Sequence, residues 1–131
     1  MSGLAGLVVG MVLVSLLVAA TPQTGGVGVS RGPNGEPAVH MSPSNFAQNV
    51  VLVPTGSSLL IVADSSAEHV LHYGRWDADG VPHPLVEPGA PLLQHEEMRG
   101  GSMVLGPFTT VGVYHLYCTI HQGMNLTIVV E

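Results

Sequence analysis

The chain has 131 residues, of which 9 are acidic and 3 are arginines, with no lysine, so its formal net charge is −6. This charge excludes a nucleic-acid binder, because such proteins need clustered cations to displace the counterions of phosphates. The apolar fraction of 46% is high enough for a buried core. A single cysteine, Cys118, excludes an internal disulfide and a Cys-x-x-Cys redox pair.

The first 20 residues form an apolar segment that is typical of a targeting sequence. Leu4–Ala20 is almost continuously apolar, and no charged side chain occurs before Arg31. Val18 and Ala20 suit the −3 and −1 positions of a signal-peptidase site, while the length is at the short end for a bilayer span. Residues 1–20 are therefore predicted to be a signal peptide or an uncleaved membrane anchor. Either one implies export to the periplasm or another extracytoplasmic space.

Residues 21–37 are rich in glycine and proline, which predicts a linker that contains one edge strand. Residues 38–131 are predicted to form one domain of short strands separated by turn signals. These runs are Phe46–Val53, Ser58–Ala63, Glu68–Tyr73, Met103–Phe108, Val111–Cys118 and Asn125–Glu131. Residues 54–57 predict a hairpin or a tight turn that switches sheets. Val81–Gly101 contains four prolines and predicts a long irregular loop with little regular pairing.

Outside the N-terminal segment no window shows sustained helical periodicity. About seven short strands with regular turn signals are typical of an antiparallel β-sandwich. The predicted fold is therefore all-β, a Greek-key antiparallel β-sandwich preceded by an apolar N-terminal helix or signal segment.

Three potential metal ligands lie in the last predicted hairpin. Cys118, His121 and Met124 are separated by three residues each, across the turn between two strands. A thiolate, an imidazole and a thioether in one loop favour copper over a hard cation. Zinc is expected to recruit a better fourth donor than methionine. Gln122 offers an alternative axial oxygen, but the spacing of Met124 fits better.

A copper site of this type needs one more imidazole from a distant strand. His69 follows the bend at residues 64–68, where a side chain can lean over the end of the sandwich. His72 lies three residues further on and faces the other side of the strand. His69 is therefore favoured over His72. The remaining candidates, interpreted as solvated or directed to the opposite face, are His40, His83, His95 and His115.

The residues around this loop resemble those of the cupredoxins, the small blue copper proteins of the plastocyanin and amicyanin type. The resemblance is carried by Tyr-x-x-Tyr-Cys-Thr-Ile-His-x-Gly-Met at residues 114–124, after Gly-Pro-Phe-x-Thr-x-Gly-x-Tyr at residues 106–114. It covers about Phe46–Glu131, and the short loop is most similar to the amicyanin type. The Pro-rich insert Val81–Gly101 departs from the family pattern.

The resemblance implies that one type 1 copper is held by His69, Cys118 and His121 as strong ligands, with Met124 as the weak axial ligand. Thr119 and the backbone N–H groups near it are candidates to donate hydrogen bonds to the thiolate. In the resembling family the loop histidine, here His121, shows its ring edge at an apolar surface patch. Candidates for that patch are Gly106, Pro107, Gly123 and Leu126.

The function that follows is a mononuclear copper electron carrier that cycles between Cu(I) and Cu(II) and exchanges electrons with redox partner proteins. The negative charge would direct it toward basic partner surfaces. A copper chaperone or storage protein without redox cycling is the alternative. An enzyme is not expected, because the sequence offers neither a second copper centre nor a nucleophile-elbow motif.

Overall fold

The computed structural model describes residues 30–93 and 96–131, and its described part is a curled β-sheet. The prediction of an all-β fold is confirmed. The strands are β1 (Ser30–Arg31), β2 (Pro37–Met41), β3 (Val50–Val53), β4 (Leu59–Trp76), β5 (Pro82–Pro84), β6 (Glu96–Leu105), β7 (Gly112–Cys118) and β8 (Asn125–Val130).

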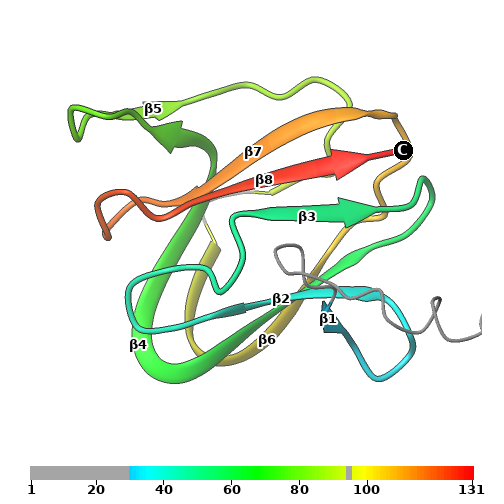
Figure 1. The fold of residues 1–131 in the computed structure, drawn as a ribbon, viewed down its shortest axis with the longest axis horizontal. Helices are drawn as coiled ribbons and strands as arrows, with labels where there is room; N and C mark the ends of the chain where they lie inside the picture. Colours follow the sequence, from blue (N-terminus) through cyan, green and yellow to red (C-terminus); the bar gives the residue numbers. More distant parts are fainter. Residues whose placement is uncertain (1–29, 94–95) are drawn as a thin grey trace, which may run out of the picture.

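Strand β4 connects the two layers of the structure. Its first half pairs with β2 and β6, and its second half pairs with β6, β7 and β5. The pairing with β6 is irregular between Ala63 and Glu68, where the strand bends. Figure 1 shows β4 curling from the layer of β1, β2 and β6 into the layer of β7, β8 and β3. The two runs predicted around residues 58–73 are therefore one continuous strand.

The sheet is mixed, which corrects the prediction of purely antiparallel pairing within the sandwich. Strands β2 and β4 are parallel, and so are β3 and β8. The reason is the turn at residues 54–57, which does not close a hairpin between β3 and β4. It sends the chain from one layer to the other, with Ser57 N–H donating to the Pro54 carbonyl at 2.9 Å. The alternative prediction for this turn, a switch between sheets, describes the structure.

The prediction of an irregular loop over Val81–Gly101 is wrong at both ends. Strand β5 begins at Pro82, and β6 begins at Glu96 and runs through the end of the predicted loop. Proline is tolerated in β5 because that strand lies at a sheet edge and pairs only with β4. The long β4 supplies the pairing partner for β6, which periodicity in the loop itself could not reveal.

The N-terminal predictions fall mostly outside the described residues. The predicted signal peptide or anchor, residues 1–20, lies entirely outside them. Strand β1 lies inside the predicted linker, residues 21–37, and pairs antiparallel with β2. No helix within residues 30–93 and 96–131 has the length and apolar character needed to cross a membrane.

The core lies between the two layers and is filled by alternate residues of the long strands. Leu59, Ile61 and Leu71 of β4 are fully buried, as are Leu116 of β7 and Ile128 of β8. Each such side chain contributes about 1.5–3 kcal/mol through burial. This packing holds the ends of β4, β7 and β8 in fixed relative positions.

The first half of β7 pairs with β8 on one side, whereas the pairing of β7 with β4 on the other side covers only residues 116–118. Glu87, in the segment between β5 and β6, fills part of this gap. Its Oε1 accepts from the backbone N–H of His115 at 2.7 Å and contacts His115 Nδ1 at 2.9 Å. A carboxylate side chain thus supplies a hydrogen-bond acceptor that a neighbouring strand would otherwise supply.

We expect Glu87→Ala to lower the free energy of unfolding by about 1–3 kcal/mol, because it leaves a half-buried backbone N–H without an acceptor. Urea unfolding followed by circular dichroism measures this change. Glu97→Ala is the matched control, since Glu97 is exposed on β6, and it should shift the value by less than about 0.5 kcal/mol. Equal losses in the two variants would contradict the role assigned to Glu87.

Candidate metal centre

The register between β4 and β7 places His69 and Cys118 on one face of the sheet. Leu71 pairs directly with Cys118, and His69 lies two residues before Leu71 on the same strand. Residues two apart on a strand share a face, so the side chains of His69 and Cys118 point into the same interior. His72 pairs with Tyr117 and therefore faces the opposite side.

The loop between β7 and β8 folds back tightly on itself. The N–H of Cys118 donates to the Met124 carbonyl at 3.1 Å, and the N–H of Met124 donates to the His121 carbonyl at 3.1 Å. Gly123 has a φ of +80°, which a glycine adopts without strain. These bonds bring His121 back toward Cys118. The loop between β7 and β8 lies at the end of the structure where β4 curls (Figure 1).

The side chains of His69, Cys118 and His121 meet at one point. One ligand atom from each of the three lies within 4.8 Å of the others. His121 Nδ1 is 3.3 Å from Cys118 Sγ, and the two imidazole centroids are 5.1 Å apart. Three donors that surround one ion at about 2.0–2.3 Å lie roughly 3.3–4.0 Å apart. The three donor atoms are therefore close enough for a single ion to bind all of them after small side-chain adjustments.

His69 carries the strongest indication that this group binds a metal. Its side chain is 0% exposed, and neither ring nitrogen has a hydrogen-bond partner. Burial lowers the pKa of His69, and the neighbouring His121 lowers it further. The nearby Ser42 backbone raises the pKa in part, without forming a hydrogen bond to either ring nitrogen. A buried imidazole held neutral, with its lone pair unused, suits metal ligation.

Cys118 is 0% exposed and is the only cysteine in the chain. The backbone N–H of Val70 donates to its Sγ at 3.5 Å. The prediction that Thr119 or its neighbouring N–H groups would donate to the sulfur is not met, because the N–H of Thr119 donates to the Val70 carbonyl at 2.8 Å. The donor comes instead from β4, next to His69.

Met124 is also completely buried, at the end of the ligand loop. Its side chain belongs to the core cluster that includes Cys118. Gln122, the alternative axial donor, is exposed. Burial therefore favours Met124 over Gln122 as the fourth donor of the group.

The other described histidines are engaged elsewhere. His40 Nδ1 is 2.8 Å from an Asp64 oxygen, and His83 Nε2 is 2.8 Å from Asp77 Oδ2. The backbone N–H of Val81 donates to the Asp77 carboxylate, and this bond, followed by the contact with His83, lowers the pKa of the Asp77 carboxyl.

Two further histidines, His72 and His115, form hydrogen bonds away from the metal group. His72 bonds to the Tyr73 carbonyl, and His115 bonds to Glu87. His95 lies outside the described residues.

Two residues beside the loop were not anticipated from the sequence. Trp76 and Asn125 hydrogen-bond to each other, and the indole of Trp76 donates to the Cys118 carbonyl. No local pattern identifies them, because the contacts span 42 and 49 residues.

Solved structures of two copper-protein types, an amicyanin and a purple cupredoxin, are similar to the described part of the chain. A reduced amicyanin variant matches with a TM-score of 0.56 and 20% identity, covering 84% of this chain and 95% of that one. A purple cupredoxin from Nitrosopumilus maritimus matches with a TM-score of 0.50 and 17% identity, covering 70% of this chain and 98% of that one. No family model and no curated protein matches the sequence. The described part of the chain therefore has the cupredoxin fold, and its His–Cys–His group fits one type 1 copper.

Proposed function

We propose that this protein is a mononuclear type 1 copper electron carrier. The observation that carries the proposal is the buried His69, whose two ring nitrogens have no hydrogen-bond partner, beside Cys118 and His121. An unpaired buried imidazole costs stability unless something occupies it. A metal ion coordinated by these three residues removes that cost.

The donor set determines which metal and which chemistry fit. Two imidazoles and a thiolate with a thioether nearby are typical of blue-copper electron-transfer sites. Bound copper would supply a one-electron Cu(I)/Cu(II) couple. His69 and Cys118 are held by the packed β4 and β7, so these ligands change position little between the two oxidation states. His69, Cys118 and His121 are proposed as the strong ligands and Met124 as the axial one.

His121 is the proposed route to a redox partner, because it is the least buried of the three grouped residues. The adjacent Ile120 is 48% exposed, and Gly123 is exposed as well. The prediction that Gly106 and Pro107 belong to this patch is wrong, because they adjoin Phe108, which hydrogen-bonds to residues 56 and 57 at the end of β7 opposite the loop. Leu126, a candidate for the apolar patch, is only 1% exposed and belongs to the core. The net charge of −6 supports a redox partner with a basic docking surface.

Export is part of the proposal and rests on the sequence. Residues 1–20 would serve as a signal peptide or as a membrane tether, with residues 21–37 as the linker to the copper domain. The mass of the mature protein distinguishes the two, because cleavage after Ala20 removes a defined segment. The proposed role does not include catalysis.

Titration with Cu(II), followed by visible spectroscopy, tests the function. We expect an intense absorption band at about 600 nm, which a short copper–thiolate bond in a trigonal site produces. The band should disappear on reduction and return on oxidation over repeated cycles. A colourless Cu(II) complex, or copper released on reduction, would instead support a chaperone or storage protein.

Met124→Gln should keep copper bound and lower the reduction potential, because an oxygen donor favours Cu(II) more than a thioether does. A tenfold change in relative affinity corresponds to about 59 mV for one electron, and we expect a decrease of at least that size. Met103→Gln, in β6 outside the loop, is the control and should leave the potential unchanged. An unchanged potential in Met124→Gln would show that Met124 is not the axial ligand.

A further inference from the structure

A set of hydrogen bonds joins the ligand loop to the end of β4. Trp76, the only tryptophan of the chain, is the last residue of that strand. Its indole Nε1–H donates to the Cys118 carbonyl at 2.8 Å. Its backbone N–H donates to Asn125 Oδ1 at 2.8 Å, and its carbonyl accepts from Asn125 Nδ2 at 3.0 Å. We call these three bonds the Trp76–Asn125 clamp.

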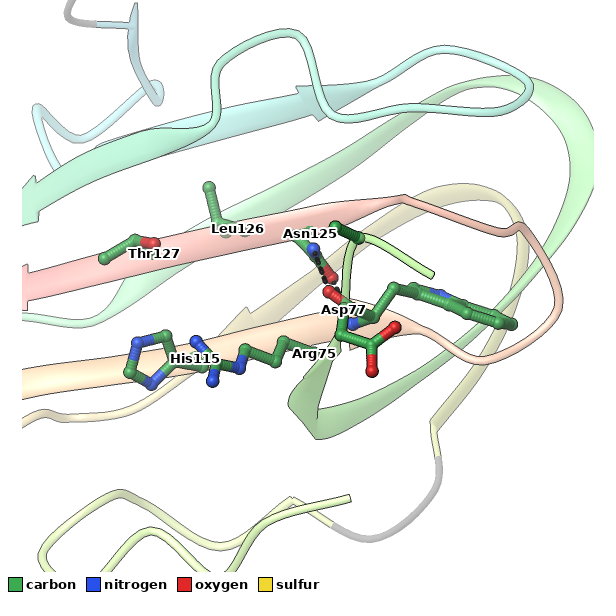
Figure 2. Close-up of a pocket in the computed structure, with 8 residues that line it drawn as sticks. Arg75, Asp77, His115, Asn125, Leu126 and Thr127 are labelled. Carbon is green, nitrogen blue, oxygen red and sulfur yellow. Dashed lines mark hydrogen bonds between the residues drawn. The ribbon is translucent and has the colours of Figure 1, made fainter. Parts of the chain in front are cut away.

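The clamp contacts both ends of the loop. Cys118 begins the loop, and Asn125 directly follows Met124 at its end. Figure 2 shows Asn125 with its dashed hydrogen bonds at the wall of a pocket of about 400 Å³, which Trp76 also lines. The clamp thereby connects β4, a third strand, to a loop whose two ends are already joined by the pairing of β7 with β8.

Gly74 allows β4 to reach this position. The pairing of β4 with β7 ends at Tyr73 opposite Leu116, and from Gly74 the strand pairs with β5. If the β7 register continued, Trp76 would lie opposite Val113, five residues from Cys118. The φ of Gly74 is +135°, and a Cβ there would collide with the His83 carbonyl. The kink therefore directs Trp76 back toward the start of the loop.

The ring of Trp76 packs edge-on against Tyr117 after this kink. The two ring centroids are 6.2 Å apart, with an interplanar angle of 87°. Edge-to-face packing restricts the indole to a narrow range of orientations. The N–H is thus held in line with the Cys118 carbonyl.

Every polar group of Cys118 has a hydrogen-bond partner in this arrangement. Its N–H donates to Met124, its Sγ accepts from Val70, and its carbonyl accepts from the Trp76 indole. The first two partners are backbone groups, which the fold supplies whatever the side chains are. The third is a side chain, so it can be removed without changing the strands.

We propose that Trp76 and Asn125 are positioning residues that hold Cys118 and its loop in the ligating arrangement before any metal binds. The inference rests on the proposed function for the identity of the loop as a ligand loop. Its test needs no metal, so it can succeed or fail independently of copper binding.

The test measures how fast a thiol reagent, 5,5′-dithiobis(2-nitrobenzoate), modifies Cys118 in the metal-free full chain. Cys118 is 0% exposed, so the reagent reaches it only when the loop opens. Trp76→Phe keeps an aromatic ring and removes the N–H. We expect modification to become about fivefold to tenfold faster, which corresponds to the loss of one hydrogen bond that restrains the loop.

Tyr114→Phe is the matched control. It also removes one hydrogen bond from a side chain to a backbone carbonyl, that of the Tyr114 hydroxyl to Thr110 at 2.7 Å. Tyr114 lies on β7 four residues before Cys118 and does not contact the loop bonds described above. In Tyr114→Phe, the rate at which the reagent modifies Cys118 should stay within about twofold of the rate in the chain without substitutions. The reason is that local opening of the loop does not involve this bond.

Asn125→Ala tests the other half of the clamp. Trp76→Phe removes the indole bond of the clamp, and Asn125→Ala removes its two bonds to the Trp76 backbone. Because the bonds restrain the same loop cooperatively, the double variant Trp76→Phe/Asn125→Ala should react more slowly than the product of the two single effects predicts. Three results would each overturn the proposal: an unchanged rate in Trp76→Phe, an equal increase in Tyr114→Phe, or fully multiplicative effects. If these rates support the clamp but the Cu(II) complex is colourless, the positioning role of Trp76 and Asn125 is retained and the proposed copper electron carrier is rejected.

Discussion

Cys118→Ser is expected to abolish the blue absorption band of the copper-loaded protein completely. The band near about 600 nm requires a thiolate bound to copper, and the chain has no other cysteine to replace it. A serine hydroxyl is a harder and much less acidic donor. The visible spectrum after addition of one equivalent of Cu(II), recorded beside that of the unmodified protein, measures the change.

Thr119→Val is the matched control for this experiment. Thr119 adjoins Cys118, and its backbone N–H donates to the Val70 carbonyl, a bond that valine retains. Its side chain has no hydrogen bond to the sulfur in the structure. The band should therefore persist in Thr119→Val. A band that survives in Cys118→Ser would refute the proposed site, because no other thiolate could produce it.

His69→Ala is expected to weaken copper binding by at least about 100-fold, whereas His72→Ala should weaken it by less than about tenfold. The difference follows from strand direction. His69 faces Cys118 and His121, while His72 faces the other side, hydrogen-bonds to the Tyr73 carbonyl and packs edge-on against Tyr117. Competition with a coloured copper chelator gives both dissociation constants.

The pKa of His69 adds a condition for that measurement. Because burial lowers its pKa, the ring stays neutral below the ordinary histidine value of about 6.5. Protons therefore compete with copper for His69 only at more acidic pH, and the comparison is best made at pH 7. Added imidazole should restore part of the affinity of His69→Ala by entering the cavity. A larger loss in His72→Ala would reverse the assignment of the two histidines.

The Trp76–Asn125 clamp and the Glu87 contact share a physical feature. In both, a polar side chain hydrogen-bonds to a backbone group of β7, the Cys118 carbonyl for Trp76 and the His115 N–H for Glu87. The clamp lies at the metal end of β7 and the Glu87 contact toward its other end. The two variants should therefore differ in their effects. Glu87→Ala should lower the free energy of unfolding of the whole domain, and Trp76→Phe should mainly increase local opening of the loop.

The amino-acid sequence alone was sufficient for the all-β class and for the donor types in the loop. Short β-branched runs separated by glycine and proline restrict the chain to strands, because no helical face is present. The loop ligands are close in sequence, so the spacing of Cys118, His121 and Met124 already indicates copper. The chemistry of a site can be predicted from the sequence wherever its interacting residues are neighbours in the chain.

Only the tertiary structure decided the features that depend on distant pairing. The parallel pairing of β2 with β4, the start of β6 inside the Pro-rich segment and the kink at Gly74 each depend on which strand lies alongside. The same holds for His69, whose buried ring lacks hydrogen-bond partners only because β4 packs against β7 at that register. Strand register is set by the packing of the whole core, and residues separated by about 50 positions leave no periodic signal of their contact.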